Sequence, residues 1–262
     1  MDQIIENLPK TAGYKMGNTF FHVVCYADDA VLIADTEDNL QRLLHAFNLK
    51  AKQLNMIINT EKTKCLVTSK EAVRCKLEVD SKLIEQVNHF QYLGVGISSY
   101  GNLQKEVREH TMKASRISGC LNDIVWRNKY LNTESKIRIY KAAIRPVITY
   151  AAETRPDTAK TMQMMRTTEM KVLRSIHGKT LHDRARNEDI REWSKIQDIG
   201  RWVRQRRRHW NKHVRRMDDN RLAKKAQQNN PIGKRSQGRP PKRWRECWTS
   251  SSGEDLLGLN RR

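Results

Sequence analysis

The chain has 262 residues, 38% of them hydrophobic and 30% charged, so it can bury a core and is too apolar to be disordered throughout. No apolar run approaches the ~20 residues that cross a bilayer, which argues against a membrane protein. Residues 1–100 carry 11 Lys and Arg against 12 Asp and Glu, whereas residues 101–262 carry 39 against 17. This excess of +22 in the second part predicts a polyanionic partner.

Five cysteines are scattered without C-x-x-C spacing, which is typical of reduced thiols in an intracellular protein. The first ten residues lack the apolar core of a signal peptide. We therefore expect a nuclear or cytoplasmic protein that makes no use of a membrane.

The segment 20–35 consists of two apolar runs, rich in β-branched and aromatic residues, on either side of Asp28 and Asp29. It predicts a buried β-hairpin with its turn at residues 27–29. Adjacent carboxylates in an apolar setting repel each other unless a cation neutralises them. Oxygen ligands without Cys or His favour Mg²⁺ or Mn²⁺, and hence phosphoryl or nucleotidyl transfer. The alternative is a solvated Asp-Asp turn.

The next segments continue a mixed α and β pattern. Asp35 or Thr36 is expected to cap a helix whose apolar residues pack beneath the hairpin, at positions Leu40, Leu43, Leu44, Phe47, Ala51 and Leu54. Residues 54–67 predict a strand, a turn with Lys62 and Lys64, and a second strand, and residues 70–89 a polar hairpin. Residues 90–98 combine aromatic and β-branched residues with two glycines. They predict strands in close approach or a core strand with a glycine bulge.

From residue 102 the pattern is helical. One stripe contains Leu103, Val107, His110, Ala114, Ile117, Leu121 and Ile124. A second helix is expected to be capped by Thr133 and kinked by Pro146, and a third to run from Thr158 to His177 before Gly178. We expect the outer faces to carry Lys105, Arg108, Lys113, Arg116, Arg127, Lys129, Lys136, Arg138, Lys141 and Arg145.

Residues 183–244 are strongly basic. Aromatic residues are interleaved with arginines in residues 201–217, a pattern that suits phosphate contacts and base stacking. His209 and His213 lie one helical turn apart but have no Cys or carboxylate beside them, which argues against a metal site. Gly238-Arg239-Pro240 is similar to the minor-groove core of an AT-hook, although the match is short. Residues 249–262 are predicted to be disordered.

Three segments resemble one family. Tyr26-Ala27-Asp28-Asp29 resembles the Y-A-D-D motif of reverse transcriptases. An Asn followed by Lys62-Thr63-Lys64, and then Phe90-x-Tyr92-Leu93-Gly94, make the resemblance specific to the reverse transcriptases of non-LTR retrotransposons. It implies Asp28 and Asp29 as metal ligands, Lys62 or Lys64 beside the incoming triphosphate, and a primer-grip hairpin at residues 90–98.

The resemblance extends to the basic half. Arg207, Trp210, His213, Arg216 and Met217 match an R-x-x-W-x-x-H-x-x-R-M stretch of related element proteins, and a G-R-P-x-K-R-W tail is frequent among them, which explains the Gly-Arg-Pro better than an independent DNA hook. The expected nucleic-acid contacts are Tyr26, Tyr92, Leu93, Gly94, Lys113, Arg116, Arg204, Arg207, Trp210, Arg239, Lys242 and Arg243.

The expected fold class is α+β. Residues 1–100 would form a partial palm, with an antiparallel sheet and a helix, and residues 101–180 a helical thumb bundle. Residues 181–248 would form a basic helical connector with a nucleic-acid-binding tail, followed by the disordered segment 249–262.

The expected function is an RNA-directed DNA polymerase that takes an RNA template, a DNA primer, deoxynucleoside triphosphates and Mg²⁺ or Mn²⁺. The resemblance covers the C-terminal half of such an enzyme. A third aspartate, the fingers and the preceding endonuclease domain are not found in this sequence, so we expect activity to need the missing N-terminal half as a partner. The alternative is a noncatalytic remnant that binds nucleic acid.

Overall fold

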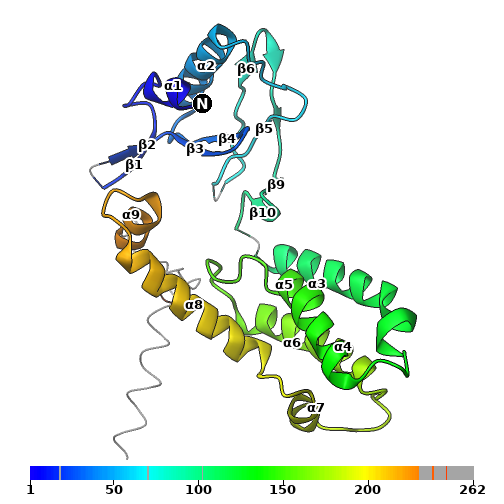
Figure 1. Ribbon diagram of the computed structural model, residues 1–262. Helices are drawn as coiled ribbons and strands as arrows, with labels where there is room; N and C mark the ends of the chain where they lie inside the picture. Colours follow the sequence, from blue (N-terminus) through cyan, green and yellow to red (C-terminus); the bar gives the residue numbers. More distant parts are fainter. Residues whose placement is uncertain (18, 70, 102, 230–237, 239–245, 247–262) are drawn as a thin grey trace, which may run out of the picture. The chain divides into compact units, whose positions relative to one another are not determined.

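The computed structural model describes residues 1–17, 19–69, 71–101, 103–229, 238 and 246. They form two compact units, unit 1 over Met1–Asn102 and unit 2 over Leu103–Gln227. The first combines small sheets with two helices and the second is helical (Figure 1), so the chain is a mixed α and β protein compatible with the expected α+β class. The palm, thumb and connector remain predictions.

Unit 1 contains short strands that pair two by two. Within the described residues the antiparallel pairs are β1–β2, β3–β4, β6–β7 and β9–β10, and the parallel pair is β5–β8. The elements are α1 (Asp2–Glu6), β1 (Tyr14–Met16), β2 (Thr19–Phe21), β3 (Val23–Tyr26), β4 (Asp29–Leu32), α2 (Glu37–Gln53), β5 (Lys64–Cys65), β6 (Glu78–Val79), β7 (Lys82–Leu83), β8 (Glu85–Gln86), β9 (His89–Tyr92) and β10 (Val95–Ser98). The expected single antiparallel sheet is therefore replaced by separate ladders.

Helix α2 organises the core of unit 1. The Thr36 side chain, one of the two caps that the sequence offers, caps it by accepting a hydrogen bond from the backbone of Asn39 at 3.3 Å. Leu43 and Phe47 face α1 and the β3–β4 hairpin, whereas Leu44 faces a second cluster formed by the β5–β8 region. One amphipathic helix thus supports the hairpin that carries the two aspartates.

Two sequence-based expectations for unit 1 are wrong. Residues 54–63 form no strand in the structure, and strand β5 begins only at Lys64. Phe20 and Phe21 belong to the preceding strand β2, and the side chains of β3 and β4 are half-buried rather than buried. The stretch around the aspartates is consequently a short, partly exposed hairpin.

Unit 2 is built around α3 and α6. Its elements are α3 (Leu103–Cys120), a π-helical turn (Asn122–Trp126), α4 (Thr133–Ile139), a second π-helical turn (Tyr140–Ile144), α5 (Arg145–Ile148), α6 (Ala159–Ile176), α7 (Asn187–Ser194), α8 (Ile199–Arg216) and α9 (Leu222–Gln228). Met165, Leu173 and Ile199 are among its fully buried side chains. The helices before and after residue 180 share one core.

The π-helical turns explain where the helical pattern fails. The backbone NH of Trp126 donates to the carbonyl of Leu121, five residues back, which shifts the side-chain phase. As a result Val125 and Trp126 are buried, while Ile124, expected to face inward, is exposed. Ile117, also expected to face inward, lies in α3 before the turn and is exposed as well. The second turn precedes Pro146, whose ring cannot continue a regular helix.

Candidate active site and nucleic-acid contacts

The two aspartates lie at the tip of the β3–β4 hairpin. Tyr26 pairs with Asp29 as the last pair of the ladder, so Ala27 and Asp28 form a two-residue turn. Ala27 adopts a φ of 53°, in the left-handed region where a residue with a Cβ is strained by about 1 kcal/mol. Tyr26 and both aspartates are exposed. The turn therefore presents two adjacent carboxylates to solvent on a strained backbone.

The donor chemistry of this turn suits a hard cation, but the ligand set is partial. Mg²⁺ takes six oxygens, commonly one or two of them from carboxylates and the rest from water and phosphates. Asp28 and Asp29 supply such oxygens, whereas the described residues include no group of three or more His, Cys, Asp or Glu able to hold a metal. The turn can thus provide protein ligands to a cation whose shell other molecules complete.

The β9–β10 hairpin brings Tyr92 close to this turn. Burial, and then the negative charges of Asp29 and Cys25, raise the pKa of Tyr92 above its usual value. Its hydroxyl is buried and has no hydrogen-bond partner among the described residues. The hairpin turns at Leu93 and Gly94, both with positive φ, of 47° and 80°. Tyr92 therefore has a buried, unused hydroxyl within electrostatic range of Asp29.

The structure distinguishes the two candidate lysines. The Nζ atom of Lys64 lies 2.6 Å from Glu85 on the paired strand β8, so its charge is already matched. Lys62 is exposed and has no acidic partner in the described part of the chain. The side chain of Asn59 accepts hydrogen bonds from the backbone of Glu61 and Lys62, at 3.1 and 3.0 Å. Asn59 thus shapes the turn, a role that its position before a polar turn could have indicated.

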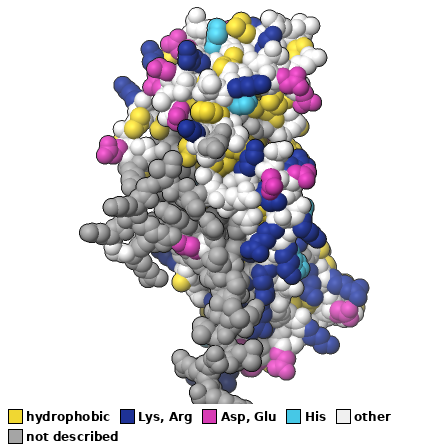
Figure 2. All heavy atoms as spheres, turned by 90° about the vertical axis from the view of Figure 1, so that its left-hand side faces the viewer, with side chains coloured by type: hydrophobic (Ala, Val, Ile, Leu, Met, Phe, Trp, Pro, Cys, Tyr) yellow, Lys and Arg dark blue, Asp and Glu magenta, His cyan; other side chains and the backbone are white. Residues whose placement is uncertain are grey.

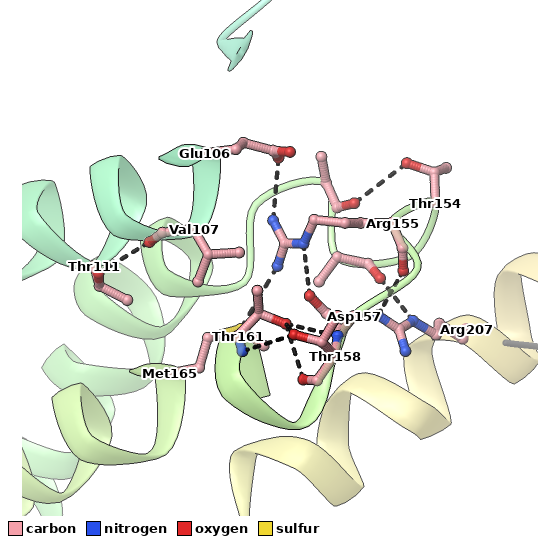
Figure 3. Close-up of polar contacts among 12 residues, drawn as sticks. Glu106, Val107, Thr111, Thr154, Arg155, Asp157, Thr158, Thr161, Met165 and Arg207 are labelled. Carbon is pink, nitrogen blue, oxygen red and sulfur yellow. Dashed lines mark hydrogen bonds and ion pairs between the residues drawn. The ribbon is translucent and has the colours of Figure 1, made fainter. Parts of the chain in front are cut away.

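Arg207 was expected to contact nucleic acid, and the structure contradicts this. Its side chain is 5% exposed, and its guanidinium donates to the carbonyls of Ala152 and Arg155, both at 2.8 Å, and to the carboxylate of Asp157. Arg155 in turn binds Asp157 and Glu106, at 2.8 and 3.1 Å (Figure 3). These two arginines and two acids form a charge-balanced buried network that fixes α8 to the segment before α6.

Lys136 and Arg145 also differ from expectation, because both turn into the core. Lys136 donates to the carbonyl of Trp126 at 2.8 Å. Arg145 lies over the rings of Tyr140 and Trp202, at 5.3 and 5.6 Å, and 3.7 Å from Glu169. The other basic residues expected on the outer faces are exposed, including Lys113 and Arg116 on α3.

The remaining expected contacts lie on α8 and in the tail. Arg204 is exposed, whereas Trp210 is half-buried with its ring 5.6 Å from that of His213, which leaves less of it for base stacking. Arg239, Lys242 and Arg243, and the segment 249–262, lie outside the described residues.

Sequence analysis missed a basic hollow of about 1100 Å³ between α6, α7 and α8. Seven of its lining side chains are Lys or Arg and two are acidic, and Figure 2 shows Lys and Arg gathered on the face that carries α8. Lys171 and Arg174 on α6, and Arg201 and Arg204 on α8, are spaced to share a helix face. This spacing in the sequence could have indicated two basic helix faces, but the sequence does not show that the faces of α6 and α8 border the same hollow.

Membrane-spanning helices are absent from the part of the chain that the structure describes. None of its helices combines the length and the apolar character required to cross a bilayer.

Comparisons with known proteins match the first unit to a family and align both units with longer or similar proteins. Residues 1–97 match the family described as reverse transcriptase (RNA-dependent DNA polymerase). The chain is 27% identical over 228 residues to a transposon-derived protein of Caenorhabditis elegans, an alignment that covers 84% of this chain and 81% of that protein.

Two longer relatives carry polymerase names. The RNA-directed DNA polymerase from mobile element jockey of Drosophila funebris is 30% identical over 194 residues, covering 70% of this chain. The retrovirus-related Pol polyprotein of a type-1 retrotransposable element of Nasonia vitripennis is 32% identical over 118 residues, covering 41% of this chain. The chain spans 21% and 12% of these two proteins. Together the matches support a relationship of this chain to the reverse transcriptases of non-LTR retrotransposons, carried most directly by residues 1–97.

Proposed function

We propose that this chain supplies the metal-binding turn and part of the nucleic-acid grip of an RNA-directed DNA polymerase of a non-LTR retrotransposon. Its substrates would be an RNA template, a DNA primer and deoxynucleoside triphosphates. The observation that carries the proposal is the turn at Ala27 and Asp28, where a strained backbone presents two exposed carboxylates within the segment that matches the reverse transcriptase family.

In this proposal Asp28 and Asp29 hold Mg²⁺ or Mn²⁺. When bound, such a cation stabilises charge on phosphoryl oxygens and favours ionisation of the attacking hydroxyl. Lys62, exposed and without an acidic partner in the described structure, would protonate the departing pyrophosphate. Lys64 instead fixes strand β5 through Glu85.

The β9–β10 hairpin would hold the primer. Tyr92 has a buried hydroxyl without a partner among the described residues, and its raised pKa keeps it protonated as a donor near Asp29. Its hydrogen bond to a primer oxygen would orient the 3′ end beside the carboxylates. Leu93, which is exposed, and the neighbouring Gly94 would contact the sugar-phosphate backbone.

Because the chain spans only 21% and 12% of the two polymerase relatives, the activity of those whole proteins is itself part of the proposal. Two carboxylates from one turn do not complete the ligand set for two cations. We expect the other ligands to come from substrate phosphates, water and a further polypeptide segment.

The test combines metal binding with primer extension. The purified chain is titrated with Mn²⁺ by electron paramagnetic resonance in the presence of primer-template and a triphosphate. The same samples are assayed for extension on an RNA template, with and without the polymerase segment that precedes this region in the relatives. Asp28→Asn with Asp29→Asn should remove the bound Mn²⁺ and any extension, while primer-template binding is kept.

The chain offers a matched control in a second adjacent acid pair, Asp218 and Asp219, which is exposed and lies in unit 2. Asp218→Asn with Asp219→Asn removes the same charge and should leave Mn²⁺ binding unchanged. Equal Mn²⁺ binding by the wild type and the Asp28, Asp29 variant would refute the metal assignment.

The second candidate is a noncatalytic nucleic-acid-binding protein. It is favoured by the surplus of cations in the basic hollow and by the transposon-derived relative, which this chain covers over 81% of its length. Salt-dependent binding of primer-template without extension, even when the preceding segment is supplied, would support this candidate over the first.

A further inference from the structure

The basic hollow of unit 2 has more positive charge than its own acids can match. It is bounded by α6, residues 179–181, α7 and α8, with a volume of about 1100 Å³. Asp198 binds Arg166 through two hydrogen bonds, at 2.9 and 3.1 Å, and contacts Arg191 at 3.1 Å. The carboxylate of Asp198 is therefore already paired with Arg166 and Arg191.

Lys179 lies 3.8 Å from Asp183, whereas four further cations of the hollow lack an acidic partner among the described residues. Lys171, Arg201 and Arg204 are exposed and have no acidic partner among the described residues. Arg174 donates to neutral acceptors, the side chain of Asn187 at 2.6 Å and the carbonyl of Ala185 at 3.4 Å, so its charge is not cancelled. Its Nε atom is buried without a partner in the described structure. Four cationic groups thus remain available to an anion.

These cations are held on a rigid frame. Asp198 caps α8 by accepting a hydrogen bond from the backbone of Arg201 at 3.1 Å, while Arg166 on α6 holds the same carboxylate. Gly200 allows the start of α8 to approach α6, because a Cβ there would lie 2.9 Å from the sulfur of Met162. The two helices that carry the four cations are therefore fixed to each other, which is the preorganisation that a binding site needs.

We infer that this hollow, called here the basic groove, binds the phosphodiester backbone of a nucleic-acid strand. Four cations on neighbouring helices suit successive phosphates of one strand. No aromatic side chain lines the described walls of the groove, so it contacts phosphates rather than stacking on bases. Binding through phosphates alone carries little sequence preference. The inference rests on the proposed function only for the class of partner, and it does not need the aspartates.

The experiment measures binding of fluorescently labelled 20-nucleotide DNA and RNA single strands, and of a 20-base-pair duplex, to the full chain by anisotropy at several NaCl concentrations. The groove variant neutralises three exposed cations, Lys171→Gln, Arg201→Gln and Arg204→Gln. The control variant neutralises three exposed lysines of unit 2 that lie outside the groove and have no acidic partner in the described structure, Lys129→Gln, Lys141→Gln and Lys160→Gln.

We expect the groove variant to bind the single strands at least about tenfold more weakly at 100 mM NaCl. Its salt slope should fall by roughly 2, at ~0.7 for each phosphate that the protein no longer neutralises. The control variant should stay within about threefold of the wild type. Conservative changes that keep the charge, Lys171→Arg, Arg201→Lys and Arg204→Lys, should restore most of the binding.

Three results would overturn the inference. One is equal weakening by the groove and control variants, because net charge alone would then explain binding. Another is wild-type affinity of the groove variant. A third is displacement of the strand by free deoxyadenosine triphosphate at micromolar concentration, which would make the occupant a single nucleotide.

The result also separates this inference from the proposed function. The Asp28→Asn, Asp29→Asn variant should keep wild-type binding in the groove. Failure of the groove variant to lose affinity would refute the groove and leave the metal assignment intact. Unchanged Mn²⁺ binding in the aspartate variant would refute the metal assignment and leave the groove intact.

Discussion

Replacing Arg207 by Ala tests whether this residue belongs to the core or to a nucleic-acid surface. The substitution removes hydrogen bonds to the carbonyls of Ala152 and Arg155 and the ion pair with Asp157, all of them buried. Removing one partner of a buried ion pair costs about 3–5 kcal/mol. Because Arg155 still binds Asp157, we expect the lower end of this range, about 3 kcal/mol.

Unit 2 offers a selective probe for this measurement. Four of the six tryptophans, Trp126, Trp193, Trp202 and Trp210, lie in unit 2 and none lies in residues 1–102, so the change in their fluorescence follows the unfolding of unit 2 and not of unit 1. A loss of 3 kcal/mol should lower the midpoint of this transition by roughly 10 °C. Arg204→Ala, an exposed position on the same helix, should change the free energy of unfolding by less than ~0.5 kcal/mol.

A double variant sharpens the test. Asp157→Asn leaves Arg207 without its ion pair, but combined with Arg207→Ala it removes the unbalanced charge. The double variant should therefore lose less stability than the sum of the single variants. The reasoning is refuted if Arg207→Ala unfolds like the wild type and instead weakens nucleic-acid binding more than Arg204→Ala does.

The remaining predictions concern unit 2. Tyr140→Phe removes a buried hydroxyl that donates to Glu169 at 2.9 Å and should cost about 1–2 kcal/mol in urea unfolding; a neutral result would show that the bond contributes nothing net. Thr158→Ala removes the cap of α6 and should cost about 1 kcal/mol, whereas Thr158→Ser should cost less; equal losses would exclude capping as the cause. Burial, and after it the charge of Lys113, lower the pKa of His110 in the folded state below its ordinary value of 6.5. The stability that neutral His110 contributes is therefore fully present above pH 6.5 and is lost as the pH falls through the lowered pKa of the folded state. The temperature at the midpoint of unfolding of unit 2 should decrease when the pH is lowered from 7.5 to 5.5, and it should decrease less in His110→Gln. An equal decrease in that variant would assign the pH dependence to other groups.

The features that the sequence predicted correctly depend on residues close together in the chain. The β3–β4 turn follows from two apolar runs around one acid pair, the cap at Thr36 was one of two adjacent candidates, and α6 lies within one residue of the expected range 158–177 at either end. The cap of α4 was predicted one residue too late, because Asn132 rather than Thr133 accepts the hydrogen bond from the backbone of Ser135, at 2.8 Å. Asn and Thr are both good caps, so composition alone does not choose between neighbours.

The features that the sequence did not predict depend on contacts between distant residues. Arg207 looked like its exposed neighbours, because its partners lie some 50 residues earlier. Ile124 follows the helical period but is exposed, because it lies within the π-helical turn, where the side-chain phase changes. The basic groove likewise needs α6 and α8 to be placed side by side. The geometry of the candidate catalytic turn was predictable from local sequence, whereas the ion pair that distinguishes Lys64 from Lys62 depends on the position of Glu85.

The long sequence separation within the buried network also sets an order of events during synthesis. Asp157 leaves the ribosome 50 residues before Arg207, an interval of roughly 3–10 s at ~5–20 residues per second. Until then the two acids of the network, Asp157 and Glu106, have only Arg155 as a cationic partner, so burying both of them is costly. The helices α3 to α6 can therefore collapse early, but their junction closes only when α8 arrives, and nascent chains halted before Arg207 will be the ones most sensitive to proteolysis at residues 149–158.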